Sequence, residues 1–192
     1  MDRILAGYAA AAAELRPRYD TIDSALLYGA VMAHFPKKPS RILDIGAGTG
    51  RDAAWLAGLG HDVLAVEPVA AFRAGGKALC WLDDRLPDLA KTRGLGRKFD
   101  FILVNAVFQH VRAAAMQNIA GLLATDGRIV MSLRHGPAAA SRPAFPFETG
   151  EVEGLAADCG LATLLQCNRP TVGAKNKALG VRWELLVFGG AG

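Results

Sequence analysis

The chain has 192 residues, of which 52% are hydrophobic and 21% are charged, and its formal net charge is +4. This composition predicts one folded domain with at most a short appendage, and it excludes a largely disordered chain. Lysine and arginine never run longer than two in succession, so nucleic-acid binding is permitted but not indicated. Cys80, Cys159 and Cys167 have no metal-ligand spacing, which predicts reduced thiols, no metal site and a cytoplasmic location. Neither a secretory signal nor a membrane span is expected.

The hydrophobic pattern predicts two helices, over 4–16 and 21–35, followed by alternating strands and helices. The expected strands are 41–45, 62–66, 78–82, 99–105, 127–133, 161–167 and 181–188. The expected helices among them are 50–58, 68–75, 113–123 and 148–159. A polar loop, 168–179, joins the last two strands, and such a pair is most simply antiparallel. The pattern predicts an α/β fold with a mainly parallel sheet between two helical layers.

The stretch Arg41–Gly50 reads Arg-Ile-Leu-Asp-Ile-Gly-Ala-Gly-Thr-Gly and is the most informative part of the chain. Its first half predicts a buried strand, and Gly46, Gly48 and Gly50 predict a tight turn. Glycine permits a positive φ and lets a ligand come close to the backbone. The helix expected after the turn would aim its free N–H groups at the same place. This arrangement predicts a site for an adenosine-containing cofactor.

The next strand ends in a carboxylate, Glu67, which lies 17 residues after Gly50. An acid at this place accepts hydrogen bonds from ribose hydroxyls, although a solvated strand end is the alternative. The GxGxG spacing differs from the GxGxxG of dinucleotide-binding proteins, which disfavours a nicotinamide-dependent oxidoreductase. Asp44-x-Gly-x-Gly-x-Gly followed by Glu67 resembles the class I S-adenosylmethionine-dependent methyltransferases. The resemblance covers about residues 41–188.

The resemblance implies a Rossmann-like three-layer sandwich whose seven-stranded sheet has one antiparallel strand near an edge. It also implies S-adenosylmethionine as cofactor and S-adenosylhomocysteine as product. The domain is expected over 41–192, with a helical segment, 1–40, covering the cofactor. The cofactor-binding residues that it implies are Asp44, Gly46, Ala47, Gly48, Gly50, Glu67, Pro68, Asp83, Asp84, Asn105 and Tyr19.

Several of these roles have structural alternatives. Asp44 is expected to hold the amino group of the methionine part, and Asn105 is expected to face the sulfonium. Asp83 or Asp84 is expected to accept a hydrogen bond from the adenine amine, and for each acid the alternative is a cap for the following short helix. Tyr19 is expected near the methionine carboxylate, with ordinary packing as the alternative.

The acceptor side is expected at the ends of the strands 99–105 and 127–133. His110 follows the first of these strands and is a candidate general base, unless it only binds backbone. Arg134 suits an acidic group of the substrate, and His135 is a second candidate base. These three residues are the predicted catalytic set, beside a proline-rich segment, 138–147, that is expected to line the acceptor pocket.

The resemblance therefore implies methyl transfer, and we expect a small-molecule acceptor. The Pro-Pro-Tyr/Phe extension of amino-group methylases and the Pro-Cys pair of cytosine-carbon methylases are both missing from this sequence. An RNA or protein methyltransferase on the same core remains an alternative, and so does a cofactor-binding protein without catalysis. The sequence identifies neither the acceptor nor the oligomeric state.

Overall fold

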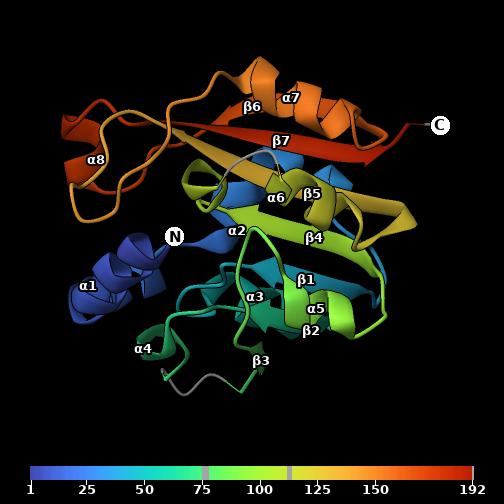
Figure 1. Cartoon of the computed structure of the whole chain (residues 1–192), viewed down its shortest axis with the longest axis horizontal. Helices are drawn as coiled ribbons and strands as arrows, with labels where there is room; N and C mark the ends of the chain where they lie inside the picture. The colour runs from blue at the N-terminus through green and yellow to red at the C-terminus, as the bar shows by residue number, and fades with distance from the viewer. Residues whose placement is uncertain (75–77, 112–113, 192) are drawn as a thin grey trace.

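The computed structural model describes residues 1–74, 78–111 and 114–191, which form a seven-stranded sheet flanked by helices (Figure 1). The strand order is β3-β2-β1-β4-β5-β7-β6. The strands are β1 (Arg41–Ile45), β2 (Asp62–Val66), β3 (Cys80–Leu82), β4 (Phe99–Asn105), β5 (Leu123–His135), β6 (Leu161–Arg169) and β7 (Arg182–Gly190).

Strands β1 to β5 pair in parallel, whereas β7 pairs antiparallel with both β5 and β6. This topology confirms the predicted fold, including the reversed strand near one edge. Parallel strands covered on both faces read as continuous apolar runs, which is why β1, β2 and β4 were predicted with their observed bounds. Their carboxyl ends meet at one edge of the sheet.

The helical elements lie on both faces of the sheet and at its edge. They are α1 (Asp2–Asp20), α2 (Ser24–Tyr28), the 3-10 helix η1 (Gly29–His34), α3 (Arg51–Gly58), α4 (Ala70–Arg73), α5 (Ala90–Gly94), the 3-10 helix η2 (Phe108–His110), α6 (Ala114–Ala120), α7 (Thr149–Ala157) and α8 (Ala174–Ala178). Within the described ranges, no helix combines the length and the apolarity that a membrane crossing needs.

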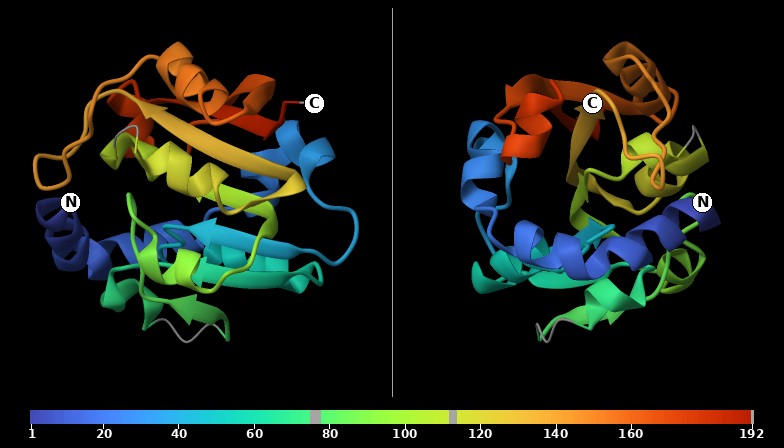
Figure 2. Two further views of the ribbon diagram at one scale, coloured as in Figure 1. Left: turned by 45° about the vertical axis from the view of Figure 1, so that its right-hand side comes forward. Right: turned by 90° about the vertical axis from the view of Figure 1, so that its left-hand side faces the viewer.

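Two apolar layers enclose the sheet, and a third cluster attaches the first helix. Helices α6 and α7 cover one face through residues such as Met116 and Val152, and α2, η1 and α3 cover the other. Helix α1 instead packs on α4, with Leu15 against Val69 and Phe72. Figure 2 shows that α1 consequently lies across one end of the sheet.

Some predicted elements differ from the observed ones. The expected helix 21–35 begins at Ser24, where the Asp23 carboxylate accepts a hydrogen bond from the Leu26 N–H (3.2 Å), and it continues as the 3-10 turn η1. Strand β5 is longer than expected at both ends, because Arg134 and His135 pair with β7 and Leu123 pairs with Phe99 of β4. The short helix α8 was not predicted, and α5 was expected only as the short helix that an acid after β3 would cap. The expected helix ends at residues 75 and 113 lie outside the described residues.

Candidate functional site

The glycine turn after β1 forms the floor of a cavity of about 510 Å³. The N–H groups of Gly46 and Ala47 donate to the Val66 carbonyl, at 2.8 and 2.9 Å, so the turn is tied to the end of β2. Gly48 has φ +56° and a Cβ there would meet nothing within 4 Å, because this position faces the cavity. A Cβ on Gly46, in contrast, would lie 2.3 Å from a methyl group of Val107.

Gly50 was expected to contact the cofactor, but it does not line the cavity. It has φ +75° and precedes α3, and a Cβ there would run into the side chains of Leu79 and Trp81. Its role in the structure is therefore to let the chain turn into α3 against β3. Ala47 and Pro68 do line the cavity.

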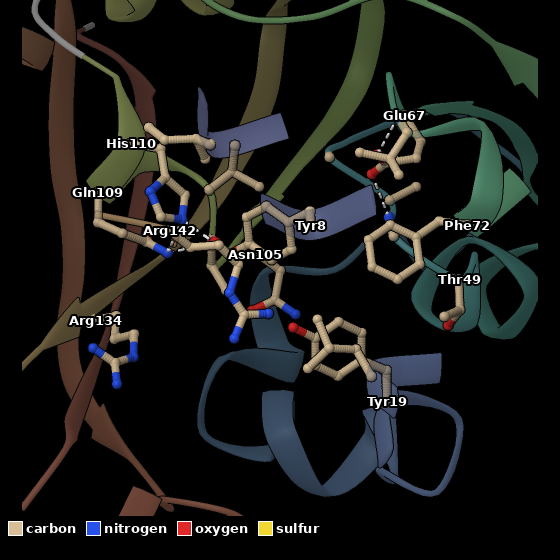
Figure 3. A pocket seen from close by; sticks show the side chains of 18 of the residues that line it. Tyr8, Tyr19, Thr49, Glu67, Phe72, Asn105, Gln109, His110, Arg134 and Arg142 are labelled. Atoms are coloured by element: carbon tan, nitrogen blue, oxygen red, sulfur yellow. Dashed lines mark hydrogen bonds between the residues drawn. The ribbon is translucent and has the colours of Figure 1, made fainter. Parts of the chain in front are cut away.

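Glu67 lies on the cavity wall immediately after β2 and is 5% exposed. Its two carboxylate oxygens accept hydrogen bonds from the Val69 N–H (2.7 Å) and the Gly48 N–H (2.9 Å) (Figure 3). Burial raises the pKa of this carboxyl. Each oxygen keeps a second lone pair, so the carboxylate still has capacity for hydroxyl donors.

The two acids after β3 have different surroundings. Asp84 lines the cavity, but its Oδ2 accepts from both the N–H and the hydroxyl of Thr92 in α5, each at 2.7 Å. Asp84 therefore caps the following short helix, as the alternative interpretation expected. Asp83 is exposed, pairs with Arg73 (3.2 Å) and does not line the cavity, which corrects the expectation that it contacts a cofactor.

Asp44, near the end of β1, is a buried carboxyl with spare capacity. It is 1% exposed, it lines the cavity, and its Oδ2 has no hydrogen-bond partner among the described residues. Burial, with a further contribution from the neighbouring carboxylate of Asp52, raises its pKa well above the usual range. A buried acceptor without a partner is costly, so this position fits a cationic donor such as a ligand ammonium.

Asp52, at the start of α3, is the centre of a buried polar network. It accepts hydrogen bonds from Ser24 (2.6 Å), Tyr28 (2.8 Å), Arg51 (2.7 and 2.9 Å) and Asn105 (3.0 Å). Burial raises the pKa of this carboxyl, but the Arg51 guanidinium and the hydrogen bonds outweigh burial and hold the pKa below its usual range. The network joins α2, α3 and the end of β4.

Asn105 lines the cavity with both ends of its amide engaged. Its Nδ2 donates to Asp52, and its Oδ1 accepts from the Ser132 hydroxyl (2.7 Å). Ser132 in turn accepts from the Ala106 N–H (2.8 Å), where the chain turns with φ +60°. The Asn105 side chain is consequently fixed in orientation rather than free to turn toward a ligand.

Tyr8 and His110 form a hydrogen-bonded pair on the acceptor side of the cavity (Figure 3). The Tyr8 hydroxyl lies 3.0 Å from His110 Nε2, and His110 Nδ1 lies 2.9 Å from the Pro143 carbonyl. Because a carbonyl only accepts, Nδ1 carries the proton and Nε2 holds a lone pair that accepts from Tyr8. Burial lowers the pKa of His110, which keeps the ring neutral.

Arg134 and His135, adjacent in β5, point to opposite faces of the sheet. Arg134 lines the cavity, and its guanidinium donates to the Gly136 carbonyl (3.1 Å). His135 instead packs on Phe147 and lies 3.6 Å from Glu184, outside the cavity. This placement corrects the expectation that His135 belongs to the acceptor site.

Several cavity residues were missed by the sequence analysis. Tyr8 lies 11 residues before Tyr19 on α1, so the two phenols share one helix face and both line the cavity. That spacing was a usable signal. Arg142, which lies over the Tyr8 ring at 5.0 Å, belongs to the segment 138–147 that was expected to line the acceptor pocket. Arg169, the last residue of β6, and Trp183, near the start of β7, carried no such signal.

Comparisons with known proteins identify the family. The model of the methyltransferase domain family matches residues 16–159. No curated protein sequence gives a significant match.

Similar solved structures share the fold. One is Burkholderia thailandensis 1,6-didemethyltoxoflavin-N1-methyltransferase with bound 1,6-didemethyltoxoflavin and S-adenosylhomocysteine, at 19% identity and TM-score 0.74, covering 100% of this chain and 88% of that one. A TehB-like S-adenosylmethionine-dependent methyltransferase from Corynebacterium glutamicum has 21% identity and TM-score 0.66, covering 94% and 98%. Magnesium protoporphyrin IX methyltransferase from Synechocystis, with bound S-adenosylmethionine, has 15% identity and TM-score 0.61, covering 95% and 79%. The chain belongs to the methyltransferase domain family and is a class I enzyme that uses S-adenosylmethionine as its cofactor.

Proposed function

We propose that this enzyme transfers a methyl group to a small-molecule acceptor bound in the cavity beside the cofactor. The observation that carries the proposal is a single cavity of about 510 Å³ lined both by the glycine turn with Glu67 and by Tyr8, His110 and Arg134. This volume is within the range of roughly 300–1,000 Å³ that is usual for small-molecule sites.

Two similar solved structures are methyltransferases of 1,6-didemethyltoxoflavin and of magnesium protoporphyrin IX, which are small molecules. At 19% and 15% identity, this likeness concerns only the fold, so the cavity is the main support. We further propose that residues 1–40 cover the cofactor site and that the domain proper extends over 41–192. The three free thiols are compatible with a cytoplasmic location, which we also propose.

The residues that line the cavity near β1 and β2 fit the cofactor. Asp44, with its unpartnered oxygen, would accept from the ammonium of the methionine part, and Glu67 would accept from the ribose hydroxyls. The surfaces that would enclose the rest of the cofactor come from Gly46, Ala47, Gly48, Pro68, Asp84, Asn105 and Tyr19.

Bound S-adenosylmethionine supplies a methyl group activated by its positive sulfur. The chain has to align the acceptor and, where the acceptor carries a proton, remove it. His110 suits proton removal because Nδ1–H is tied to Pro143 and the lone pair of Nε2 faces Tyr8 in the cavity. An acceptor that takes the place of the Tyr8 hydroxyl would meet this lone pair. Arg134, on the same side of the cavity, would pair with an acidic group of the acceptor.

The proposal is tested by incubating the enzyme with a methyl-labelled cofactor and a whole-cell extract, and identifying labelled small molecules, RNA and protein by mass spectrometry. With the acceptor found, we expect His110→Ala to lower turnover by about two orders of magnitude or more. His34→Ala, which alters a histidine outside the cavity, is the control. In His110→Ala and His34→Ala, the affinity for S-adenosylhomocysteine should stay within about threefold of that of the unaltered enzyme. Arg134→Ala should also keep this affinity, but it should use the acceptor less well.

Labelled RNA or protein without any labelled small molecule would contradict the proposal. Unchanged turnover in His110→Ala would leave the acceptor class intact but remove the proposed base. In that case catalysis would rest on alignment of the acceptor alone.

A further inference from the structure

Arg169, at the end of β6, is a buried cation in which two of the three guanidinium nitrogens have no hydrogen-bond partner among the described residues. The residue is 7% exposed, and these two nitrogens are Nε and Nη1. Its guanidinium lies 4.0 Å from the ring centroid of Trp183, and both residues line the cavity. Burial lowers the pKa of Arg169 to about 10, so the group is still protonated at neutral pH.

Trp183 lies between two arginines in one row across three strands. In the sheet register it is opposite Arg134 of β5 on one side and opposite Arg169 of β6 on the other. The Arg134 guanidinium lies 6.0 Å from the Trp183 ring centroid. Residues in register share a face of the sheet, so the two cations border the same part of the cavity. The Trp183 indole N–H is also buried without a partner.

Acidic groups of this chain do not neutralise Arg169. Within the described part of the chain, none of the carboxylates comes within 4.0 Å of its guanidinium nitrogens. Asp52 is near enough to affect its pKa, but that carboxylate is already engaged by Arg51 and by three neutral donors. Arg134 and Arg169 carry like charges, and the unpartnered donors of Arg169 and Trp183 lie beside them. An anion, which only accepts hydrogen bonds, would satisfy these donors and balance the charge.

We propose that Arg169, stacked on Trp183, binds an oxyanionic group of the methyl acceptor, a carboxylate or a phosphate. This inference rests on the proposed function and names its substrate class. The row belongs to β5, β7 and β6, whereas Asp44, Glu67 and Asn105 lie at the ends of β1, β2 and β4. Val172 and Leu179 add apolar lining nearby, which suits a hydrocarbon or ring attached to the anion.

The test uses simple probes on the enzyme saturated with S-adenosylhomocysteine. Benzoate and phenyl phosphate carry the two candidate anions, and benzamide is the neutral match of benzoate. Calorimetry compares their affinities for the unaltered enzyme, Arg169→Gln, Arg169→Lys and the control Arg93→Gln. Arg93 is an exposed residue of α5 that does not line the cavity. S-adenosylhomocysteine affinity and thermal unfolding are measured on every variant.

We expect one of the anions to bind at least about tenfold more tightly than benzamide, because charge-assisted hydrogen bonds form only with the anion. Arg169→Gln should abolish this preference, and Arg93→Gln should keep it. Arg169→Lys should retain part of it, since it keeps the charge but loses the flat fork. The lysine variant also decides the question if the glutamine variant does not fold.

Three results would overturn the subsite. Equal binding of the anions and benzamide, or no binding of any probe while S-adenosylhomocysteine binds, would refute the subsite and leave the proposed function standing. Arg169→Gln could weaken the binding of S-adenosylhomocysteine as much as the binding of benzoate. That result would show that Arg169 binds the carboxylate of the cofactor itself. An anion preference that survives in Arg169→Gln would place the binding group elsewhere. Failure of the unaltered enzyme to bind S-adenosylhomocysteine would instead refute the cofactor part of the proposed function.

Discussion

Gly48 offers a direct test of how closely the cofactor approaches the turn after β1. The residue has φ +56°, and a methyl group at its Cα would point into the cavity without touching any protein atom within 4 Å. The Gly48→Ala substitution therefore changes the cavity rather than the packing of the fold. Gly96 is a matched control, because it has φ +64°, is also free of neighbours within 4 Å, and does not line the cavity.

The expected magnitudes follow from these two environments. Alanine in the left-handed region costs about 1–2 kcal/mol of stability at either position, so both variants should unfold at similarly lowered denaturant concentrations. The added methyl at position 48 also meets the cofactor, and an overpacked contact costs about 1–3 kcal/mol. Gly48→Ala should consequently bind S-adenosylhomocysteine roughly tenfold to a hundredfold more weakly, whereas Gly96→Ala should keep its affinity.

The assay is calorimetric titration of S-adenosylhomocysteine together with urea unfolding of the ligand-free variants. The stability measurement separates the effect of strain from the effect on binding. If Gly48→Ala and Gly96→Ala bind with affinities within about threefold of each other, the turn does not approach the ligand and the cofactor placement is refuted.

Three further predictions test other parts of the site. Asp52→Ala should lower the free energy of unfolding in urea by about 3–5 kcal/mol, because it leaves the largely covered Arg51 guanidinium without its counter-ion. A loss below about 1 kcal/mol would show that the network does not stabilise the fold. Glu67→Ala should lose roughly 1–3 kcal/mol of S-adenosylhomocysteine binding by calorimetry, and equal affinity would remove Glu67 from the site. Burial lowers the pKa of His110, so the unfolded chain takes up this proton at higher pH than the folded one. The free energy of unfolding should therefore fall as the pH drops from about 6.5 through the folded-state pKa, and this fall should be smaller in His110→Asn. Identical pH slopes in the two proteins would show that the pKa of His110 is not lowered by folding.

The sequence alone was sufficient for the elements whose signal is local. Strands β1, β2 and β4 are mainly apolar segments that end at a glycine or at a polar residue, and their bounds were predicted as observed. The glycine turn and Glu67 are close in sequence, and their contact, Gly48 N–H to Glu67, spans 19 residues. Family membership follows from this local motif, which is why the fold and the cofactor were predicted together.

Short elements were harder, because they depend on packing rather than on their own pattern. Helices α5 and α8 have five residues each, too few to show a helical period. The C-terminal extension of β5 depends on its pairing with β7, which follows much later in the chain, as in Arg134 opposite Trp183. A single-sequence pattern carries no information about such a partner.

The acceptor side was decided by tertiary structure. Tyr8 meets His110 across 102 residues, so neither residue's local pattern reveals the pair. The alternation of side chains in β5 separates Arg134 from His135, but which of them faces the cavity depends on which sheet face the other helices cover. Arg169 and Trp183 meet only because β6 and β7 pair in one register. The sequence by itself determined the fold and the cofactor motif, since these follow from local hydrophobicity and backbone freedom, whereas the acceptor chemistry emerged only where distant segments were brought together by packing.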